Sequence, residues 1–119
     1  MQKPRVGLIT FGDERTNEWE KVFKNLTVPR HKEALAYFRD LPVELIASED
    51  VARTRAEIKG QVKDLAAAEV SCLIVHIPCW TAPNLIVFGV QEMGLPTILV
   101  SNKSAATHGS VGFLGAAGA

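Results

Sequence analysis

Trp80 lies in a short corner between two apolar runs, where a small polar turn would connect the runs without exposing an indole. An indole is a broad apolar plate with one N–H donor, and the C–H face of a sugar stacks on such a plate. Arg15 adds a rigid fork of donors, while Ser101 and Asn102 add smaller polar contacts. Together these side chains suit a polyhydroxylated ligand, provided that the fold brings them together.

Both of the larger side chains also have a purely structural interpretation. Tryptophan is enriched in protein interfaces, so Trp80 is equally suited to a subunit contact. Arg15 follows two acidic residues in a polar segment, where a solvated charge is the commoner role of an arginine. The choice between these interpretations depends on the geometry of the loops.

The cysteines and histidines offer little further chemistry. Cys79 is a candidate nucleophile, because a helix beginning just after it would stabilise a thiolate, but the sequence shows no neighbouring base. Cys72 and Cys79 have the spacing of neither a redox pair nor a zinc knuckle. His31, His76 and His108 are far apart, and His76 is expected to be a core histidine with a hydrogen-bond partner. We therefore predict no catalytic residue and no metal site in this chain.

The elements that must position these residues alternate between strand and helix. Short apolar runs rich in β-branched residues predict strands at 5–11, 43–47, 72–77 and 97–100. Apolar residues at helical spacing predict helices at 17–26, 30–41, 54–65 and 83–93.

Local signals set the expected ends of these helices. Asn17 with Glu20, and Thr54 with Glu57, have the spacing of a capping box at a helix start. Pro29 interrupts the first helical pattern, so we expect a break there. The last helix is expected to begin at a proline and to end at a glycine, the usual asymmetry of helix ends.

Strands that alternate with helices predict an α/β fold built from right-handed βαβ units. We expect a three-layer flavodoxin-like (Rossmann-like) sandwich with a parallel sheet, the strand order beginning 2-1-3-4. Ligands of such sheets bind beyond the carboxyl ends of the strands, between the first and third strands, where the winding reverses. The loops 12–17, 78–82 and 101–104 should share that edge, which makes Arg15, Trp80 and Asn102 the predicted binding residues.

Composition narrows the class of protein. The 119 residues suit a single α/β domain spanning 1–119. Lys plus Arg and Asp plus Glu number 13 each, so no net field favours a nucleic-acid partner. No apolar run approaches the roughly 20 residues that a bilayer span needs, and no signal peptide precedes the first strand. We expect a cytoplasmic protein without a membrane partner.

The segment 109–119, rich in glycine and alanine, ends without a helix cap or a following strand. We therefore expect this chain to be the amino-terminal part of a longer multidomain protein.

Three stretches, VGLITFGDER, HIPCW and SNKSAATHGSVGFLGAAGA, resemble the amino-terminal domain of the L-fucose isomerase and L-arabinose isomerase superfamily, especially its fucose-isomerase-like members. The resemblance covers most of the chain. It implies a domain of an aldose–ketose isomerase (a ketol-isomerase) of carbohydrate metabolism, in a cytoplasmic homo-oligomer that uses Mn²⁺.

In that superfamily the metal ligands and the acid/base carboxylates lie in later domains. The resemblance thus implies that this chain binds no cofactor itself and is inactive in isolation. It also implies that Trp80 and Arg15 contact a sugar in the active site of a neighbouring subunit. The alternative is a stand-alone flavodoxin-like module for small-molecule binding or assembly, without catalysis.

Overall fold

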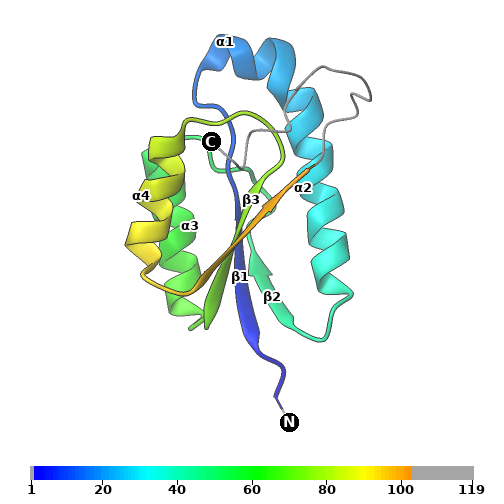
Figure 1. Ribbon diagram of the computed structural model, residues 1–119, viewed down its shortest axis with the longest axis vertical. Helices are drawn as coiled ribbons and strands as arrows, with labels where there is room; N and C mark the ends of the chain where they lie inside the picture. The colour runs from blue at the N-terminus through cyan, green and yellow to red at the C-terminus, as the bar shows by residue number, and fades with distance from the viewer. Residues whose placement is uncertain (1, 103–119) are drawn as a thin grey trace.

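Four strands form one parallel sheet in the computed structural model, which describes residues 2–102. The strand order is β2-β1-β3-β4, and all three pairings are parallel. The strands are β1 (Arg5–Thr10), β2 (Glu44–Ala47), β3 (Cys72–Ile77) and β4 (Thr97–Ser101). The predicted α/β class and strand order are confirmed (Figure 1).

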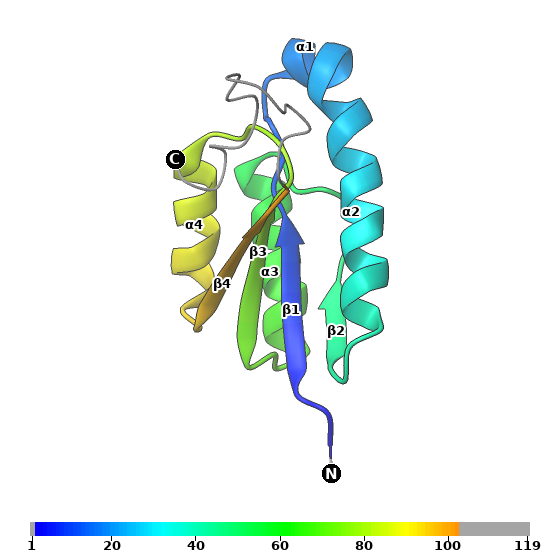
Figure 2. The same cartoon turned by 45° about the vertical axis from the view of Figure 1, so that its right-hand side comes forward.

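The helices cover both faces of the sheet. They are α1 (Thr16–Glu18), the π-helical turn η1 (Trp19–Phe23), α2 (Lys24–Arg39), α3 (Arg55–Ala67) and α4 (Pro83–Met93). Figures 1 and 2 show α2 on one side of the sheet and α3 with α4 on the other. This arrangement gives the three layers of a flavodoxin-like sandwich.

The core is divided between the two faces of the sheet. The α2 face is filled mainly by Val6, Leu8, Leu35 and Ile74. The opposite face carries a larger cluster of buried side chains: Ile9, Phe11, Ala52, Ile58, Leu65, Val70, Leu73, Val75, Ile77 and Leu85. Strand β3 contributes to both clusters, because a central parallel strand has helices over both faces.

The expected break at Pro29 is wrong. Helix α2 runs through Pro29, and the irregularity falls earlier, in η1, which buries Trp19 and Phe23. Proline inside a helix removes one hydrogen bond and crowds the preceding turn, at a cost of about 3 kcal/mol. Tertiary packing offsets this cost, since Thr27, His31 and Leu35 lie on one side of the helix at 2% exposure or less.

The expected capping boxes had different outcomes. The box at Asn17 is wrong, because the helical segment begins one residue earlier, at Thr16, without a side-chain cap. The cap at Thr54 is confirmed, since its hydroxyl accepts from Glu57 N–H at 3.2 Å. The Glu57 carboxylate accepts from Arg53 N–H at 2.9 Å instead of closing the box on the cap residue.

The remaining boundaries agree closely with the sequence. Helix α4 has Pro83 in its first turn and ends before Gly94, whose φ of 62° is the left-handed conformation that glycine favours. Strand β3 has the predicted bounds, and β4 extends one residue beyond them, to Ser101. Within residues 2–102, no helix is long and apolar enough to cross a membrane. His108 and the segment 109–119 lie outside the described residues.

The packing of α4 on the sheet predicts opposite effects for two glycine substitutions. A Cβ at Gly89 would lie 2.8 Å from Phe11 Cζ and 3.2 Å from Ile58 Cγ2, whereas a Cβ at Gly60 would meet nothing within 4 Å. Overpacking costs about 1–3 kcal/mol, and alanine gains up to about 1 kcal/mol over glycine in a helix. We expect Gly89→Ala to lower the free energy of unfolding by about 1–2 kcal/mol and Gly60→Ala to raise it slightly, as measured by urea denaturation. Equal effects of the two substitutions would contradict the packing described.

Candidate functional site

The loops that follow β1 and β3 are joined at the carboxyl edge of the sheet. Thr81, in the loop after β3, donates its hydroxyl hydrogen to the carbonyl of Gly12 at 2.9 Å. Phe11 N–H donates to the carbonyl of His76, and Ala52 N–H donates to the carbonyl of Thr10. The parallel strands β1, β3 and β4 all end at this edge, below α1 in Figure 1. It is the edge at which open α/β sheets bind ligands.

Arg15 is held by a buried carboxylate. Its Nη2 lies 2.7 Å from Asp13 Oδ2, its Nε donates to the same carboxylate at 3.1 Å, and its backbone N–H donates to Oδ1 at 3.0 Å. The Asp13 side chain is 3% exposed and that of Arg15 is 53% exposed. Burial alone would raise the pKa of Asp13, but the hydrogen bonds and charge of Arg15, with the charge of Arg53, outweigh burial and lower it. The guanidinium is thus fixed in direction while about half of the Arg15 side chain faces solvent.

Arg53 and Trp19 also stabilise the loop after β1 that holds Asp13 and Arg15. Arg53 Nε donates to the Asp13 carbonyl at 2.9 Å, and its guanidinium lies 4.5 Å from the centre of the Trp19 ring. Gly12 is required here, because a Cβ would lie 2.8 Å from Val51 Cγ1 and 3.0 Å from Trp19 Cζ3. The loop after β1 is therefore packed closely rather than free to adapt.

The corner after β3 separates a buried thiol from an exposed indole. Cys79 is 1% exposed and packs with Trp19 and Phe23, whereas Trp80 is 39% exposed. Burial raises the pKa of the Cys79 thiol, which disfavours a thiolate, so the nucleophile alternative is not supported. Trp80 retains the exposed apolar surface that both its sugar-binding and its interface interpretations need.

Asn102 is the outer end of a row of hydrogen bonds that runs into the core. Its Oδ1 lies 2.9 Å from His76 Nε2, and His76 Nδ1 lies 3.0 Å from Thr10 Oγ1. The same hydroxyl lies 2.7 Å from Nδ1 of His31, whose Nε2 is 3.0 Å from the Ser48 carbonyl oxygen. The expectation that His76 is a core histidine with a hydrogen-bond partner is confirmed.

His31 and His76 are buried, and their burial disfavours protonation of both imidazoles. Each is 2% exposed, and burial lowers the pKa of both imidazoles. The Ser48 carbonyl and the charge of Glu49 oppose this shift at His31, while the charge of Arg30 adds to it at His76. The unfolded chain therefore binds protons more readily, so these groups stabilise the fold above the usual histidine pKa and destabilise it as the pH falls below that value.

A cleft of about 400 Å³ between α2 and the ends of β3 and β4 contains one of the predicted site residues. His76 and Asn102 line it, with Arg30, Glu33 and Tyr37 among the side chains from α2. Arg30 Nη1 also donates to the Pro78 carbonyl at 2.6 Å, which ties α2 to the corner after β3.

The structure places Arg15, Trp80 and Asn102 in the three loops at one edge of the sheet. Arg15 and Trp80 lie outside the cleft that Asn102 lines. No hydrogen bond or ion pair within residues 2–102 connects the three side chains. Their assignment as binding residues stays a prediction.

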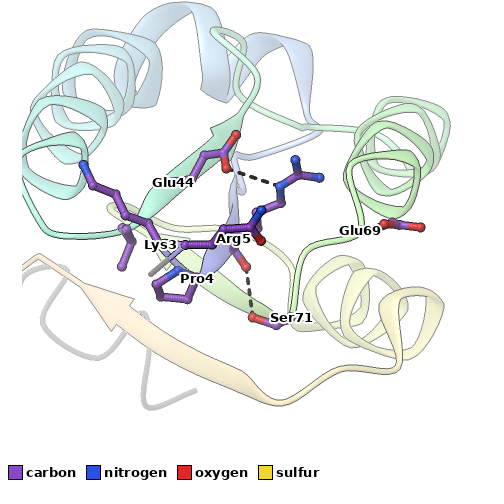
Figure 3. A pocket seen from close by; sticks show the side chains of 8 residues that line it. Lys3, Pro4, Arg5, Glu44, Glu69 and Ser71 are labelled. Atoms are coloured by element: carbon purple, nitrogen blue, oxygen red, sulfur yellow. Dashed lines mark hydrogen bonds and ion pairs between the residues drawn. The ribbon is translucent and has the colours of Figure 1, made fainter.

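A second cavity, of about 810 Å³, lies at the opposite edge, around the start of the strands (Figure 3). There Arg5 Nε lies 3.2 Å from Glu44 Oε2, and the Ser71 hydroxyl donates to the Arg5 carbonyl at 3.0 Å. These groups are solvent-exposed and bind one another, so they make a weak ligand site. Its position at the amino ends of the strands also argues against it.

A Mn²⁺ site, implied by the resemblance for the longer enzyme, does not fit the donor set described. Among residues 2–102 no three His, Cys, Asp or Glu side chains are grouped as ligands.

Comparisons with known protein families, with curated proteins and with solved structures found no match to this chain.

The sequence identified His76 but not the other buried polar residues behind the edge, among them Thr10, Asp13 and His31. The spacing of Thr27, His31 and Leu35 by four residues could have placed His31 on the buried side of its helix. No pattern in the sequence pairs His31 with Thr10, or Asp13 with Arg53, because those contacts join different elements.

The buried carboxylate predicts a pH-dependent cost for Asp13→Asn. Losing charge-assisted hydrogen bonds to a half-exposed arginine should lower the free energy of unfolding by about 1–2 kcal/mol at neutral pH. Because the pKa of Asp13 is lowered in the folded state, the difference from wild type should shrink as the pH falls through and below the ordinary carboxyl range.

Urea denaturation from neutral to acid pH measures this effect. Glu18→Gln is the matched control, since Glu18 is 3.9 Å from Arg15 and exposed, and it should cost less than about 0.5 kcal/mol. A cost for Asp13→Asn that does not depend on pH would contradict the proposed ion pair.

Proposed function

We propose that this chain is the amino-terminal, substrate-contacting and oligomerisation domain of an aldose–ketose isomerase resembling L-fucose and L-arabinose isomerases. The observation that carries the proposal is the presence of an exposed indole, Trp80, in the loop after β3 and of an anchored guanidinium, Arg15, in the loop after β1. These loops flank the point where the winding of the sheet reverses.

The chemistry of this pair suits a sugar. The 39% exposed indole of Trp80 offers an apolar plate for the C–H face of a pyranose or an open-chain aldose. Arg15 uses Nε and Nη2 on Asp13, and its Nη1, which lies 3.9 Å from Glu18 Oε1, is the group that can turn to ligand hydroxyls. Anchoring lowers the entropic cost of ordering the guanidinium when a ligand binds.

The outer edge of the sheet supports the oligomerisation part of the proposal. Among the residues that the structure describes, β4 is an edge strand, and its Ile98 and Leu99 are 56% and 50% exposed. The register places Ile98 beside Ile74 and Leu99 beside Val75, so the two point to opposite faces of the sheet. An edge strand with large apolar residues exposed on both faces suits cover by another domain or subunit.

Catalysis itself is assigned to domains beyond this chain. Moving a proton between adjacent carbons needs a positioned base. Of the carboxylates that the structure describes beside Arg15, Asp13 accepts hydrogen bonds from Arg15 and has a lowered pKa, which makes it a weak base, and Glu18 is an exposed surface group. Within this proposal, Arg15, Trp80 and Asn102 bind and orient the sugar in the active site of a neighbouring subunit. The isolated chain is expected to lack isomerase activity.

The exposed apolar edge also favours the alternative function, a stand-alone flavodoxin-like binding or assembly module. The two functions differ in what Trp80 contacts. In the isomerase it contacts a sugar, whereas in an assembly module it contacts protein.

The proposal is tested by substituting Trp80 in the protein that the longest open reading frame containing this chain encodes. With Mn²⁺ present, Trp80→Ala should raise the KM for the aldose roughly tenfold, because about 1.4 kcal/mol of stacking free energy is lost. The affinity of the protein for Mn²⁺ should stay unchanged. Arg15→Ala should act in the same direction. Trp80→Phe, which keeps an aromatic plate, should retain most of the affinity, and Val87→Ala, a 52% exposed site on α4, is the surface control.

Three outcomes would count against the proposal: absence of ketol isomerisation with a panel of aldoses, loss of metal binding in Trp80→Ala, or loss of assembly with unchanged KM. The last outcome would favour the assembly module.

The exposed edge predicts self-association through β4. Ile98→Lys should shift the protein toward smaller species in analytical ultracentrifugation, because a charge on an edge strand blocks apolar cover and strand pairing. Val22→Lys, at a 48% exposed site far along the chain from β4, should leave the distribution unchanged. Equal distributions for both variants would place the subunit contact elsewhere.

A further inference from the structure

The row of hydrogen bonds from Ser48 to Asn102 contains one more bond than neutral side chains can supply with protons while Asn102 Oδ1 faces His76. Four bonds join the Ser48 carbonyl, His31, the Thr10 hydroxyl, His76 and Asn102 Oδ1. Each bond needs one proton, and two neutral imidazoles with one hydroxyl supply three. The fourth must come from an added proton or from the amide end of Asn102.

With both imidazoles neutral, every direction in the row is fixed from its inner end. The Ser48 carbonyl can only accept, so His31 carries its proton on Nε2, and its Nδ1 accepts from the Thr10 hydroxyl. The Thr10 oxygen then accepts from His76 Nδ1–H, which leaves His76 Nε2 as an acceptor. Asn102 must therefore turn its NH₂ group toward His76 and its Oδ1 toward the cleft.

One added proton reverses the row. If His31 holds it, His31 Nδ1–H donates to Thr10, and the Thr10 hydroxyl donates to His76 Nδ1. His76 stays neutral, but its proton moves to Nε2 and is donated to Asn102 Oδ1. Asn102 then presents its NH₂ donors to the cleft.

We propose that His31, Thr10 and His76 form a proton-coupled relay in which His76 positions the Asn102 amide, presenting an acceptor to the cleft when neutral and donors when protonated. The relay rests on the proposed function only in making Asn102 a substrate contact. His76 is thus a positioning residue that determines specificity: the neutral form favours ligands that donate from a hydroxyl group, and the protonated form favours ligand oxygens that only accept.

The charges around the row decide which imidazole takes the added proton. Glu49 and Asp50, in the segment after β2, favour the cation at His31, whereas Arg30 of α2 opposes a cation at His76. Burial opposes the cation at both rings. His31 lines a cleft of about 540 Å³ next to the segment after β2, and His76 lines the cleft of about 400 Å³ between α2 and the ends of β3 and β4. The remaining charged side chains that line them are Arg53, Glu57 and Asp64 in the first cleft and Glu33 in the second.

The orientation of the row is measurable by nuclear magnetic resonance on the ¹⁵N-labelled chain without any ligand. Long-range ¹H–¹⁵N correlations at alkaline pH should show the Nε2–H tautomer for His31 and the Nδ1–H tautomer for His76. On acidification, His31 should become an imidazolium while His76 changes to the neutral Nε2–H tautomer, and the Asn102 side-chain amide should shift with the same midpoint. An Nε2–H tautomer of His76 at alkaline pH, or independent titration of the two rings, would overturn the relay.

Two variants separate the relay from a merely structural role. Thr10→Val, nearly isosteric, removes the shared hydroxyl, so the tautomer of His76 should no longer follow the charge of His31. Asn102→Asp, at the partly exposed end of the row, places an acceptor-only group on His76 Nε2. With an acceptor at this end, all four hydrogen bonds can form only if the row holds the fourth proton. The pH midpoint for protonation of His31 should therefore rise by at least about one unit, a tenfold gain in proton affinity.

An unchanged midpoint in Asn102→Asp would overturn the relay even if Thr10→Val failed to fold. Neither readout requires a sugar, so failure of the isomerase proposal would leave these measurements intact. Conversely, confirmed tautomers with a sugar KM that is insensitive to Asn102→Gln would keep the relay and remove its link to substrate.

Discussion

The parallel pairing of β1 with β3 places Thr10 directly beside His76, on the face of the sheet that α2 covers. That face is otherwise filled by apolar side chains such as Leu8 and Ile74, so the two polar groups must satisfy each other or bear the cost of burial. His31 completes the arrangement from α2. A slip of one residue in the strand register would turn these side chains to the opposite face, so the polar row favours one register over its alternatives.

The same pairing organises the edge where the candidate site lies. Since β1 and β3 are neighbours, the loop that holds Asp13 and Arg15 lies against the loop that holds Thr81 and Trp80. Burial of Asp13 converts a flexible surface arginine into a donor group of fixed direction. The loop after β3 exposes the indole because Cys79 fills the interior beside Trp19. Rigidity on one side and an exposed apolar plate on the other are the properties expected of a preorganised binding edge.

The two faces of the molecule differ in how fully they are covered. Helices α3 and α4 pack over the larger core cluster, while α2 alone packs over the other face near β1 and β2. In the described part of the chain, the ends of β3 and β4 border a cleft, and Ile98 and Leu99 of β4 form an exposed apolar edge. Asn102, which is proposed to meet a ligand, thus directly follows the strand whose Ile98 and Leu99 are proposed to meet another subunit. This adjacency is what a site shared between subunits requires.

The sequence by itself determined most element boundaries, because these follow from local signals. The alternation of strands and helices then indicated the fold class and the strand order usual for it. Apolar β-branched runs, the Thr54 cap and the Pro83 and Gly94 helix ends each act over a few neighbouring residues. It also identified the loops that meet at one edge, since the carboxyl ends of parallel strands always do. The predicted helix break at Pro29 was wrong, because contacts between α2 and the rest of the fold outweigh a single lost hydrogen bond. Only the tertiary structure decided that Asp13 is buried and that His31 and His76, which are 45 residues apart in the sequence, share one hydroxyl. Burial and hydrogen bonding between distant elements depend on the final packing, which no local pattern of residues encodes.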